Sequence, residues 1–151
     1  MNGILELQAA NQVDRGGSLS AALPRDQVAA MLHELPLIIA RRGHRVVGFL
    51  MTASRAMSVD VPIVRAMLTA YQGDPDAYIY GPICVDKEER GKRLAQSMFA
   101  KLRLLEAGRE GILFIRRDNY ASLRAHTNMG MREVARFIFD GADFAVFSYV
   151  G

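Results

Sequence analysis

In the segment VDKEERGKRLAQSMFAKL, residues 85–102, a basic, glycine-containing cluster separates a strand-like run from a helical one. From Leu94 onward, leucine, methionine and phenylalanine recur at helical spacing, and Gly108 suits the end of that helix. The cluster therefore stands where the helix begins, beside unpaired backbone N–H groups and the positive end of the helix dipole. Such a junction can bind phosphate groups, and Gly91 lets a ligand approach the backbone closely. A solvated basic turn is the alternative interpretation.

On both sides of this segment, the spacing of hydrophobic residues and the turn residues predict further helices and strands. Before it we expect a helix over 23–35, two strands within 37–53 around the polar turn Arg41–Arg45, a helix after Pro62 and a strand over 77–85. After it we expect a strand over 111–117, a short helix opened by Asp118 or Asn119, and two strands within 132–150 joined by Asp140-Gly141. The sum is an α+β fold with a mixed, mostly antiparallel central sheet flanked by helices and a C-terminal β-hairpin.

Length and composition indicate a single domain that spans residues 1–151. The chain is 50% hydrophobic and contains no uncharged apolar run long enough to cross a membrane. Its first residues lack the features of a secretory signal, and its single cysteine, Cys84, cannot form an intramolecular disulfide. We therefore expect a cytoplasmic protein without a membrane partner.

Positive charge is concentrated in the middle of the chain, although the net charge is only +3. Residues 88–136 carry eleven Lys or Arg against six Asp or Glu, an excess of five. This distribution fits either an anionic ligand or a solvated helix face. The small net charge and the lack of a basic stripe interleaved with aromatic residues argue against a nucleic-acid partner.

A first motif resembles a known family signature. The segment Arg90-Gly91-Lys92-Arg93-Leu94-Ala95 resembles the (Q/R)-x-x-G-x-(G/A) pattern of the GNAT superfamily of N-acetyltransferases. Arg90 and Ala95 agree with that pattern, whereas Arg93 occupies the usual position of the second glycine. In the family this turn donates backbone N–H groups to the pyrophosphate of acetyl-CoA, so a side chain at position 93 that points outward is compatible with the same role.

A second motif supports the same resemblance independently. Residues 119–131, NYASLRAHTNMGM, are similar to the family pattern N-x-x-(A/S)-x-x-x-(Y/H)-x-x-x-G-(F/M). The spacing places Asn119, Ser122 and His126 along one helix face. A helix cap, a first-turn serine and a surface histidine would explain the same three residues without any functional role.

Together the two motifs imply a GNAT (acyl-CoA N-acyltransferase) fold, which the resemblance covers over roughly residues 35–151. The implied activity is transfer of the acetyl group of the co-substrate acetyl-CoA to a primary amine of a small-molecule or amino-acid-like acceptor, by direct attack. The residues that the resemblance assigns to coenzyme binding are Ile83, Cys84, Val85, Arg90, Gly91, Lys92, Arg93, Leu94, Ala95, Asn119 and Ser122.

The resemblance also implies the catalytic groups. A backbone N–H in Ile83-Cys84-Val85 is expected to stabilise the oxyanion, with Gly81-Pro82 marking an irregularity in that strand. His126 stands where the family usually has tyrosine, and we expect it to protonate the leaving thiolate. The attacking amine must first be a free base. Since residues 77–85 contain no Asp or Glu, we expect a water chain ordered by Tyr80 or Tyr78, although both could be packing residues.

Several chemically capable side chains, among them the Cys84 thiol, receive no functional role. We expect Cys84 to be a core residue and treat His33 and His44 in the same way. Met51, Met57 and Met67 are also better explained by core packing than by an acceptor pocket. The spacing of Cys, His and carboxylates predicts no metal site.

Other functions stay open at this point. One is a non-catalytic acyl-CoA-binding module, and another is an acetyltransferase that acts on a protein or peptide amine. A basic RNA- or ribosome-associated domain is a third, against which the charge pattern argues. A homodimer is an assembly that the sequence allows.

Overall fold

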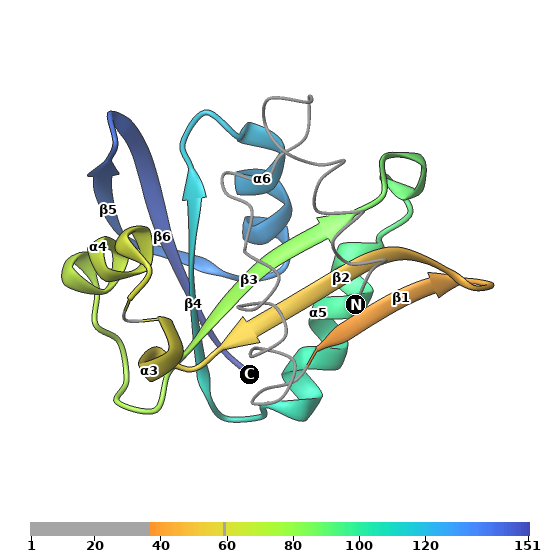
Figure 1. Ribbon diagram of the computed structural model, residues 1–151, viewed down its shortest axis with the longest axis horizontal. Coiled ribbons are helices and arrows are strands. Elements are labelled where there is room, and N and C mark those ends of the chain that lie inside the picture. Colours follow the sequence, from red (N-terminus) through yellow and green to blue (C-terminus); the bar gives the residue numbers. More distant parts are fainter. Residues whose placement is uncertain (1–36, 59) are drawn as a thin grey trace. The chain divides into compact units, whose positions relative to one another are not determined.

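The computed structural model describes residues 37–58 and 60–151, so the helix expected over 23–35 lies outside the described residues. The described residues form one six-stranded sheet in the order β1-β2-β3-β4-β6-β5, which Figure 1 shows with its flanking helices. Its strands are β1 (Ile38–Arg42), β2 (Arg45–Ala53), β3 (Tyr78–Val85), β4 (Glu110–Arg116), β5 (Arg132–Phe139) and β6 (Ala142–Val150). Strands β1 and β2, β4 and β6, and β5 and β6 pair antiparallel, whereas β3 and β4 pair parallel. The predicted α+β class with a mostly antiparallel sheet is confirmed.

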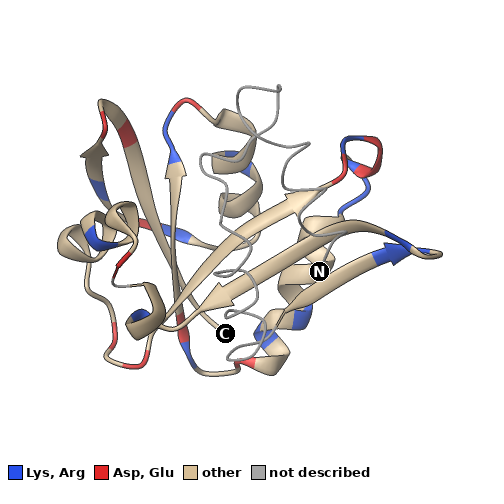
Figure 2. Ribbon diagram, in the orientation of Figure 1, with Lys and Arg blue, Asp and Glu red and all other residues tan. Residues whose placement is uncertain are grey.

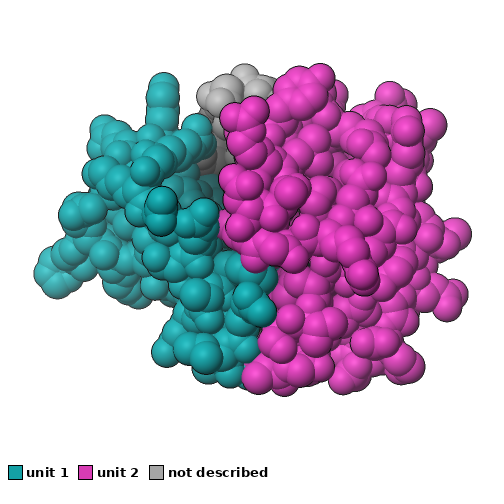
Figure 3. Space-filling model, turned by 180° about the vertical axis from the view of Figure 1, so that it is seen from behind, with its two compact units in different colours: residues 1–52, 80–105 teal, residues 53–79, 106–151 magenta. Residues whose placement is uncertain are grey.

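The chain divides into two compact units, which Figure 3 shows in different colours. Unit 1 comprises Met1–Thr52 and Tyr80–Leu105, and unit 2 comprises Ala53–Ile79 and Glu106–Gly151. The boundaries fall near the end of one strand and within another, so β2 (Arg45–Ala53) and β3 (Tyr78–Val85) each contribute to both units. Each unit is described by itself below.

Unit 1 is built on the hairpin of β1 (Ile38–Arg42) and β2, which confirms the two strands expected around the polar turn. Gly43 has a φ of 65°, a conformation that glycine adopts without cost, and it closes the turn. Helix α5 (Leu94–Leu105) buries Met98, Phe99 and Leu102. A Cβ on Gly48 of β2 would lie 3.3 Å from Met98 Cε, so the missing side chain lets the helix approach the sheet.

Unit 2 holds the C-terminal hairpin of β5 (Arg132–Phe139) and β6 (Ala142–Val150), paired with β4 (Glu110–Arg116). The turn residues Asp140 and Gly141 have φ values of 51° and 76°, the two positive values that a type I′ turn requires. Helix α4 (Pro62–Ala70) packs against β5. The rings of Phe114, Phe137 and Phe144 form one cluster, with centroids 5.2 to 6.3 Å apart.

Unit 2 also buries a carboxylate. Glu110, which is 5% exposed, accepts hydrogen bonds from the Tyr71 hydroxyl at 2.7 Å, the Asp74 amide at 2.6 Å and the Ser148 hydroxyl. These bonds tie the loop after α4 to two neighbouring strands. Burial raises the pKa of Glu110, but the three hydrogen-bond donors together lower it by more than burial raises it. The pKa therefore lies below its ordinary value.

Two short helices were not expected from the sequence. Helix α3 (Arg55–Ser58) begins where the Ser54 hydroxyl accepts a hydrogen bond from the Met57 amide at 3.1 Å. The 3-10 helix η2 (Lys87–Glu89) begins where the Asp86 carboxylate accepts one from the Glu88 amide at 3.1 Å. Each is only three or four residues long, too short for hydrophobic periodicity to reveal, and each depends on a local side-chain cap.

Candidate active site

Strand β3 confirms the strand expected over residues 77–85 and carries the first group of predicted site residues. It pairs with β4 at Tyr78–Gly111 and Ile79–Ile112, near its amino end. Gly81 then has a φ of 108° and is followed by a cis peptide to Pro82, so the backbone departs from regular strand geometry there. Beyond it Ile83 and Val85 are partly exposed, while Cys84 is buried.

The turn between η2 and α5 carries the second group. Residues 90–93 are exposed, and Gly91 has a φ of 83° with nothing within 4 Å of a built Cβ. Arg93 has a φ of 60°, a conformation rare for a residue with a side chain, at the position where the family pattern has glycine. Its carbonyl accepts a bond from the Ser97 amide at 3.1 Å, so the amides of residues 94–96 precede the first i to i−4 bond of α5.

Ion pairs tie Asp86 and Glu89, just before this turn, to the β1–β2 hairpin. Figure 2 shows both acidic and basic residues in the loop after β3 and basic residues at the hairpin turn. Arg42 holds Glu89 with two bonds, Nε to Oε1 at 2.7 Å and Nη2 to Oε2 at 2.8 Å. Lys92 Nζ lies 3.4 Å from the same carboxylate, and Arg45 pairs with Asp86. The hydrogen bond and charge of Arg42 lower the pKa of Glu89 to about 2. Of these residues only Lys92 was predicted to belong to the site; Arg42, Arg45, Asp86 and Glu89 were not.

Helix α6 (Tyr120–Asn128) in unit 2 carries the third group. Asn119, rather than Asp118, is the N-cap, and its Oδ1 accepts a bond from the Ser122 amide at 3.2 Å. The Nδ1 atom of His126 lies 2.8 Å from the Ser122 carbonyl oxygen and 3.3 Å from its hydroxyl. Since a carbonyl can only accept, the His126 tautomer with a proton on Nδ1 fits this geometry.

The alternative of a surface histidine at position 126 is wrong. His126 is only 4% exposed, although it lies on a short helix with several exposed positions. Burial lowers its pKa below the ordinary 6.5, and the bond to the Ser122 carbonyl offsets part of that effect. His126 is therefore mostly neutral at neutral pH.

The two candidate tyrosines occupy different surroundings. Tyr80 is 4% exposed, and its ring meets Phe99 edge to face at a centroid distance of 6.0 Å. Tyr78 is fully buried in unit 2, where its hydroxyl is hydrogen-bonded to the hydroxyl of Tyr149 and its ring lies 5.2 Å from the Arg109 guanidinium. Burial raises the pKa of Tyr78.

The residues without a predicted role mostly follow expectation. Cys84 is buried, and burial raises the pKa of its thiol to about 12, which leaves it a poor nucleophile. Met51 and Met67 lie in the core, as expected. The expected core placement is wrong for His44, which is exposed because it lies in the hairpin turn, and for Met57, which is partly exposed on the short helix α3. His33 lies outside the described residues. Within residues 37–58 and 60–151, no group of His, Cys, Asp and Glu could hold a metal ion, and no helix has the length and hydropathy of a membrane span.

The predicted site residues thus fall into two sets, each assembled within its own unit. Unit 1 contains Tyr80, Ile83, Cys84, Val85 and the turn over residues 90–95. Unit 2 contains Asn119, Ser122 and His126 on the cap and first two turns of one helix. The basic residues of the turn Arg41–Arg45 and the mixed charges of residues 86–93 are visible in the sequence, but they do not specify which residues pair.

Comparisons with known proteins bear on the fold. The sequence matches no protein-family model and no curated protein. A structure from Streptococcus mutans UA159 has a TM-score of 0.72 at 17% identity, covering 99% of this chain and 92% of that chain. The ribosomal-protein-S18-alanine N-acetyltransferase of Escherichia coli has a TM-score of 0.67 at 13% identity, covering 97% and 84%.

A third similar structure was solved with a ligand. It is a Salmonella typhimurium protein assigned as an acetyltransferase and solved with its cofactor acetyl-CoA, with a TM-score of 0.67 at 16% identity, covering 99% of this chain and 87% of that chain. At these identities the likeness concerns the backbone and not the side chains of the site. The chain therefore has the GNAT fold, the fold of the N-acetyltransferases that it resembles.

Proposed function

We propose that this protein is an N-acetyltransferase that moves the acetyl group of acetyl-CoA to a primary amine. The observation that supports this most directly is the exposed turn before α5, which combines open backbone at Gly91, a left-handed residue at the second glycine position of the family pattern, and several cations. The similar structures support the same function, since one carries acetyl-CoA and another is named for N-acetylation of a ribosomal protein.

The turn suits the pyrophosphate of the coenzyme. The amides of residues 94–96 are at the positive end of α5, where backbone N–H groups and the helix dipole favour an anion. A phosphate can approach Gly91 because a Cβ there would have open space around it. Lys92 and Arg93 are exposed residues of this turn and add positive charge to it.

Strand β3 suits the thioester end. The pairs of β3 with β4 are Tyr78–Gly111 and Ile79–Ile112, before the irregular backbone at Gly81, so the part of β3 after Gly81 is our candidate for the strand that runs beside the thioester. An N–H at Ile83, Cys84 or Val85 would stabilise the oxyanion that forms when the amine attacks the thioester carbonyl. Tyr80, on the same strand, is our candidate for ordering the water chain that removes the amine proton.

His126 can carry a proton between the two reacting groups. With its proton on Nδ1 donated to the Ser122 carbonyl, Nε2 holds the lone pair and must accept a proton before it can deliver one. We infer that Nε2 takes a proton from the nitrogen of the tetrahedral intermediate and gives it to the departing thiolate sulfur as the C–S bond breaks. The products are the amide and the free thiol of CoA, and His126 returns to its neutral form.

The acceptor is a primary amine of a small molecule or of an amino-acid-like compound. A protein or peptide amine is the second candidate, because the similar Escherichia coli enzyme is named for an alanine of a ribosomal protein. A screen that measures release of free CoA thiol with small amines and with short peptides separates these acceptors. Coenzyme binding without thiol release from any amine would favour an acyl-CoA-binding module instead.

Acetyl-CoA should stabilise the folded protein. At a concentration one hundred times its Kd, a ligand that binds only the folded state adds about 2.7 kcal/mol to the free energy of unfolding, which raises Tm by several degrees. Thermal unfolding with and without acetyl-CoA measures this shift, and an adenosine phosphate that lacks the thiol-bearing arm of CoA serves as a control for weak anion binding. The absence of any shift with millimolar acetyl-CoA or other acyl-CoAs would contradict the coenzyme assignment.

Gly91→Val should weaken CoA binding by about tenfold or more, since a branched side chain both disfavours the positive φ and crowds the approach of the pyrophosphate. Gly108→Val is the matched control, because Gly108 has a similar φ of 80° and equally open surroundings in the other unit. Isothermal titration with CoA compares the two variants. Equal Kd values for Gly91→Val and the wild type would mean that the phosphate site is misplaced.

A further inference from the structure

A carboxylate lies directly before the turn that should receive the pyrophosphate dianion. Glu89 lies two residues before Gly91, so their Cα atoms are at most about 7.6 Å apart. Its side chain is only 10% exposed, and it is therefore held at the turn rather than displaced into solvent. An uncompensated negative charge at that distance would repel a pyrophosphate group.

Arg42 compensates this charge. Its guanidinium donates one hydrogen bond to each carboxylate oxygen of Glu89, at 2.7 and 2.8 Å, in the bidentate geometry that makes such pairs strong and directional. Lys92 approaches one of these oxygens at 3.4 Å and gives a weaker contact. The Arg42 side chain is 68% exposed, so the cation covers the carboxylate from the solvent side.

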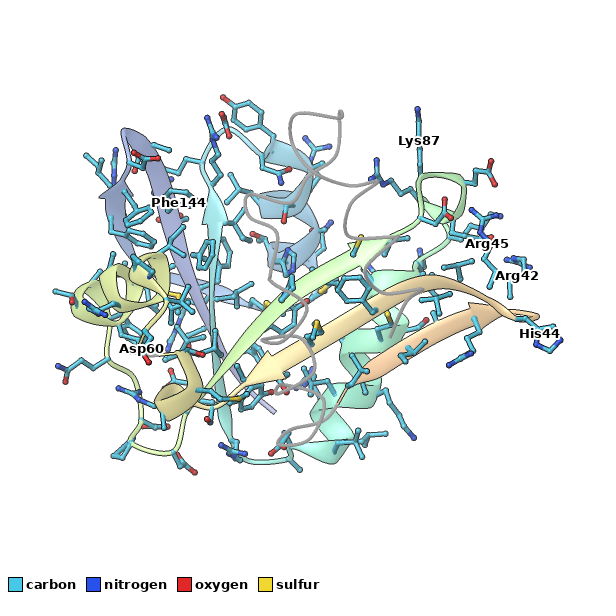
Figure 4. All side chains as sticks on the ribbon, viewed as in Figure 1. Arg42, His44, Arg45, Asp60, Lys87 and Phe144 are labelled. Atoms are coloured by element: carbon cyan, nitrogen blue, oxygen red, sulfur yellow. The ribbon has the colours of Figure 1, made fainter. Side chains whose placement is uncertain are left out.

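The turn of the β1–β2 hairpin carries further basic residues beside Arg42. Figure 4 shows Arg42 and Arg45 at this end of unit 1, with Lys87 on the adjoining loop. Arg45 pairs with Asp86, the residue whose carboxylate caps η2, and lies 3.8 Å from Glu88. The acidic residues of the loop are therefore each matched by an arginine of the hairpin.

We propose that Arg42 is a positioning residue for the coenzyme: it neutralises and fixes Glu89, so that the turn over residues 90–95 presents net positive potential and a preformed backbone to the pyrophosphate. This inference rests on the proposed function and extends it to the β1–β2 hairpin. Arg42 acts through Glu89 and need not touch the coenzyme.

The proposal predicts an asymmetry between the two members of the pair. In Arg42→Gln the largely buried Glu89 keeps its negative charge, and Lys92 is the remaining cation that the described residues place near it. We therefore expect the Kd for CoA to rise about tenfold. Glu89→Gln frees an exposed, hydrated arginine, and we expect a Kd within about threefold of the wild type. In the double variant the repelling charge is gone, so CoA binding should return to within about threefold of Glu89→Gln.

Isothermal titration with CoA at low ionic strength compares these variants with Arg41→Gln, which removes the same charge from the exposed neighbouring residue. Arg41→Gln should change the Kd for CoA by less than about threefold. Added salt should reduce the difference in Kd between Arg41→Gln and Arg42→Gln. Arg42→Lys, which keeps the charge but not the fork, should stay within about threefold of the wild type and tests the proposal even where Arg42→Gln fails to fold.

Two outcomes would overturn the proposal while the proposed function stands. In the first outcome, the wild type binds CoA, and Arg42→Gln has the same Kd for CoA as Arg41→Gln. The other is a double variant as weak as Arg42→Gln, because the pair would then serve only to hold the loop. A wild type that does not bind CoA would overturn the proposed function itself, and this inference with it.

Discussion

Replacing His126 with phenylalanine should lower kcat by about tenfold to a thousandfold, the range that a positioned acid or base supplies. The Kd for CoA should stay close to that of the wild type, since the proposed role of His126 is in proton transfer and not in holding the coenzyme. Measuring kcat with an accepted amine, and Kd by titration, separates the two effects. An unchanged kcat would remove His126 from the mechanism.

The pH dependence of kcat gives an independent test. Burial lowers the pKa of His126 below 6.5, so the neutral form that accepts a proton predominates above that pKa and is lost below it. The kcat of the wild type should therefore rise with pH through this pKa and then level off, and the rise should vanish in His126→Phe. A fall in kcat as histidine loses its proton would instead indicate direct protonation of the thiolate.

Ser122→Ala is the matched control for His126. It removes the hydroxyl contact at 3.3 Å but keeps the backbone carbonyl that binds Nδ1 at 2.8 Å. The tautomer of His126 is thus preserved, and kcat should change by less than about threefold, the effect of a weak neutral hydrogen bond. A loss as large as that of His126→Phe would place the serine hydroxyl itself in the proton path.

Glu110→Ala should destabilise the fold by about 3 to 4 kcal/mol, because it leaves several donors inside unit 2 without their acceptor. Chemical unfolding measures this loss. The folded pKa of Glu110 lies below its ordinary value of 4.5, so its contribution is fully present above that value and is lost as pH falls through the lowered pKa. The stability gap between wild type and variant should accordingly shrink in acid.

Glu133→Ala provides the comparison for Glu110. Glu133 pairs with Arg117 at 2.8 Å, but its side chain is 42% exposed, and such surface pairs contribute less than about 1 kcal/mol. A loss for Glu110→Ala no larger than that for Glu133→Ala would show that the buried hydrogen bonds do not stabilise the fold.

The parts of the fold that local chemistry determines were predictable. Asp140-Gly141 supplies two adjacent residues suited to positive φ, which specifies the last hairpin without any knowledge of its partners. The apolar face from Leu94 likewise fixed the helix that α5 confirms. The family pattern even pointed to the strained position, since Arg93 stands at a usual glycine and has a φ of 60°.

The parts that depend on distant residues were not predictable. Arg42 and Glu89 lie 47 positions apart, and nothing near either residue specifies their pairing. The burial of His126 also has no local signal, because helical spacing alone suits a surface position equally well.

The distribution of tyrosines has a spectroscopic consequence. The chain contains five tyrosines and no tryptophan, and all but Tyr80 belong to unit 2. Ultraviolet emission and near-ultraviolet circular dichroism of the native protein are therefore dominated by unit 2, where Tyr78 and Tyr149 share a hydrogen bond and an edge-to-face contact. Optical signals will report little of unit 1, which holds the phosphate turn. A tryptophan in place of Phe99, whose ring adjoins Tyr80, would give that unit a reporter of its own.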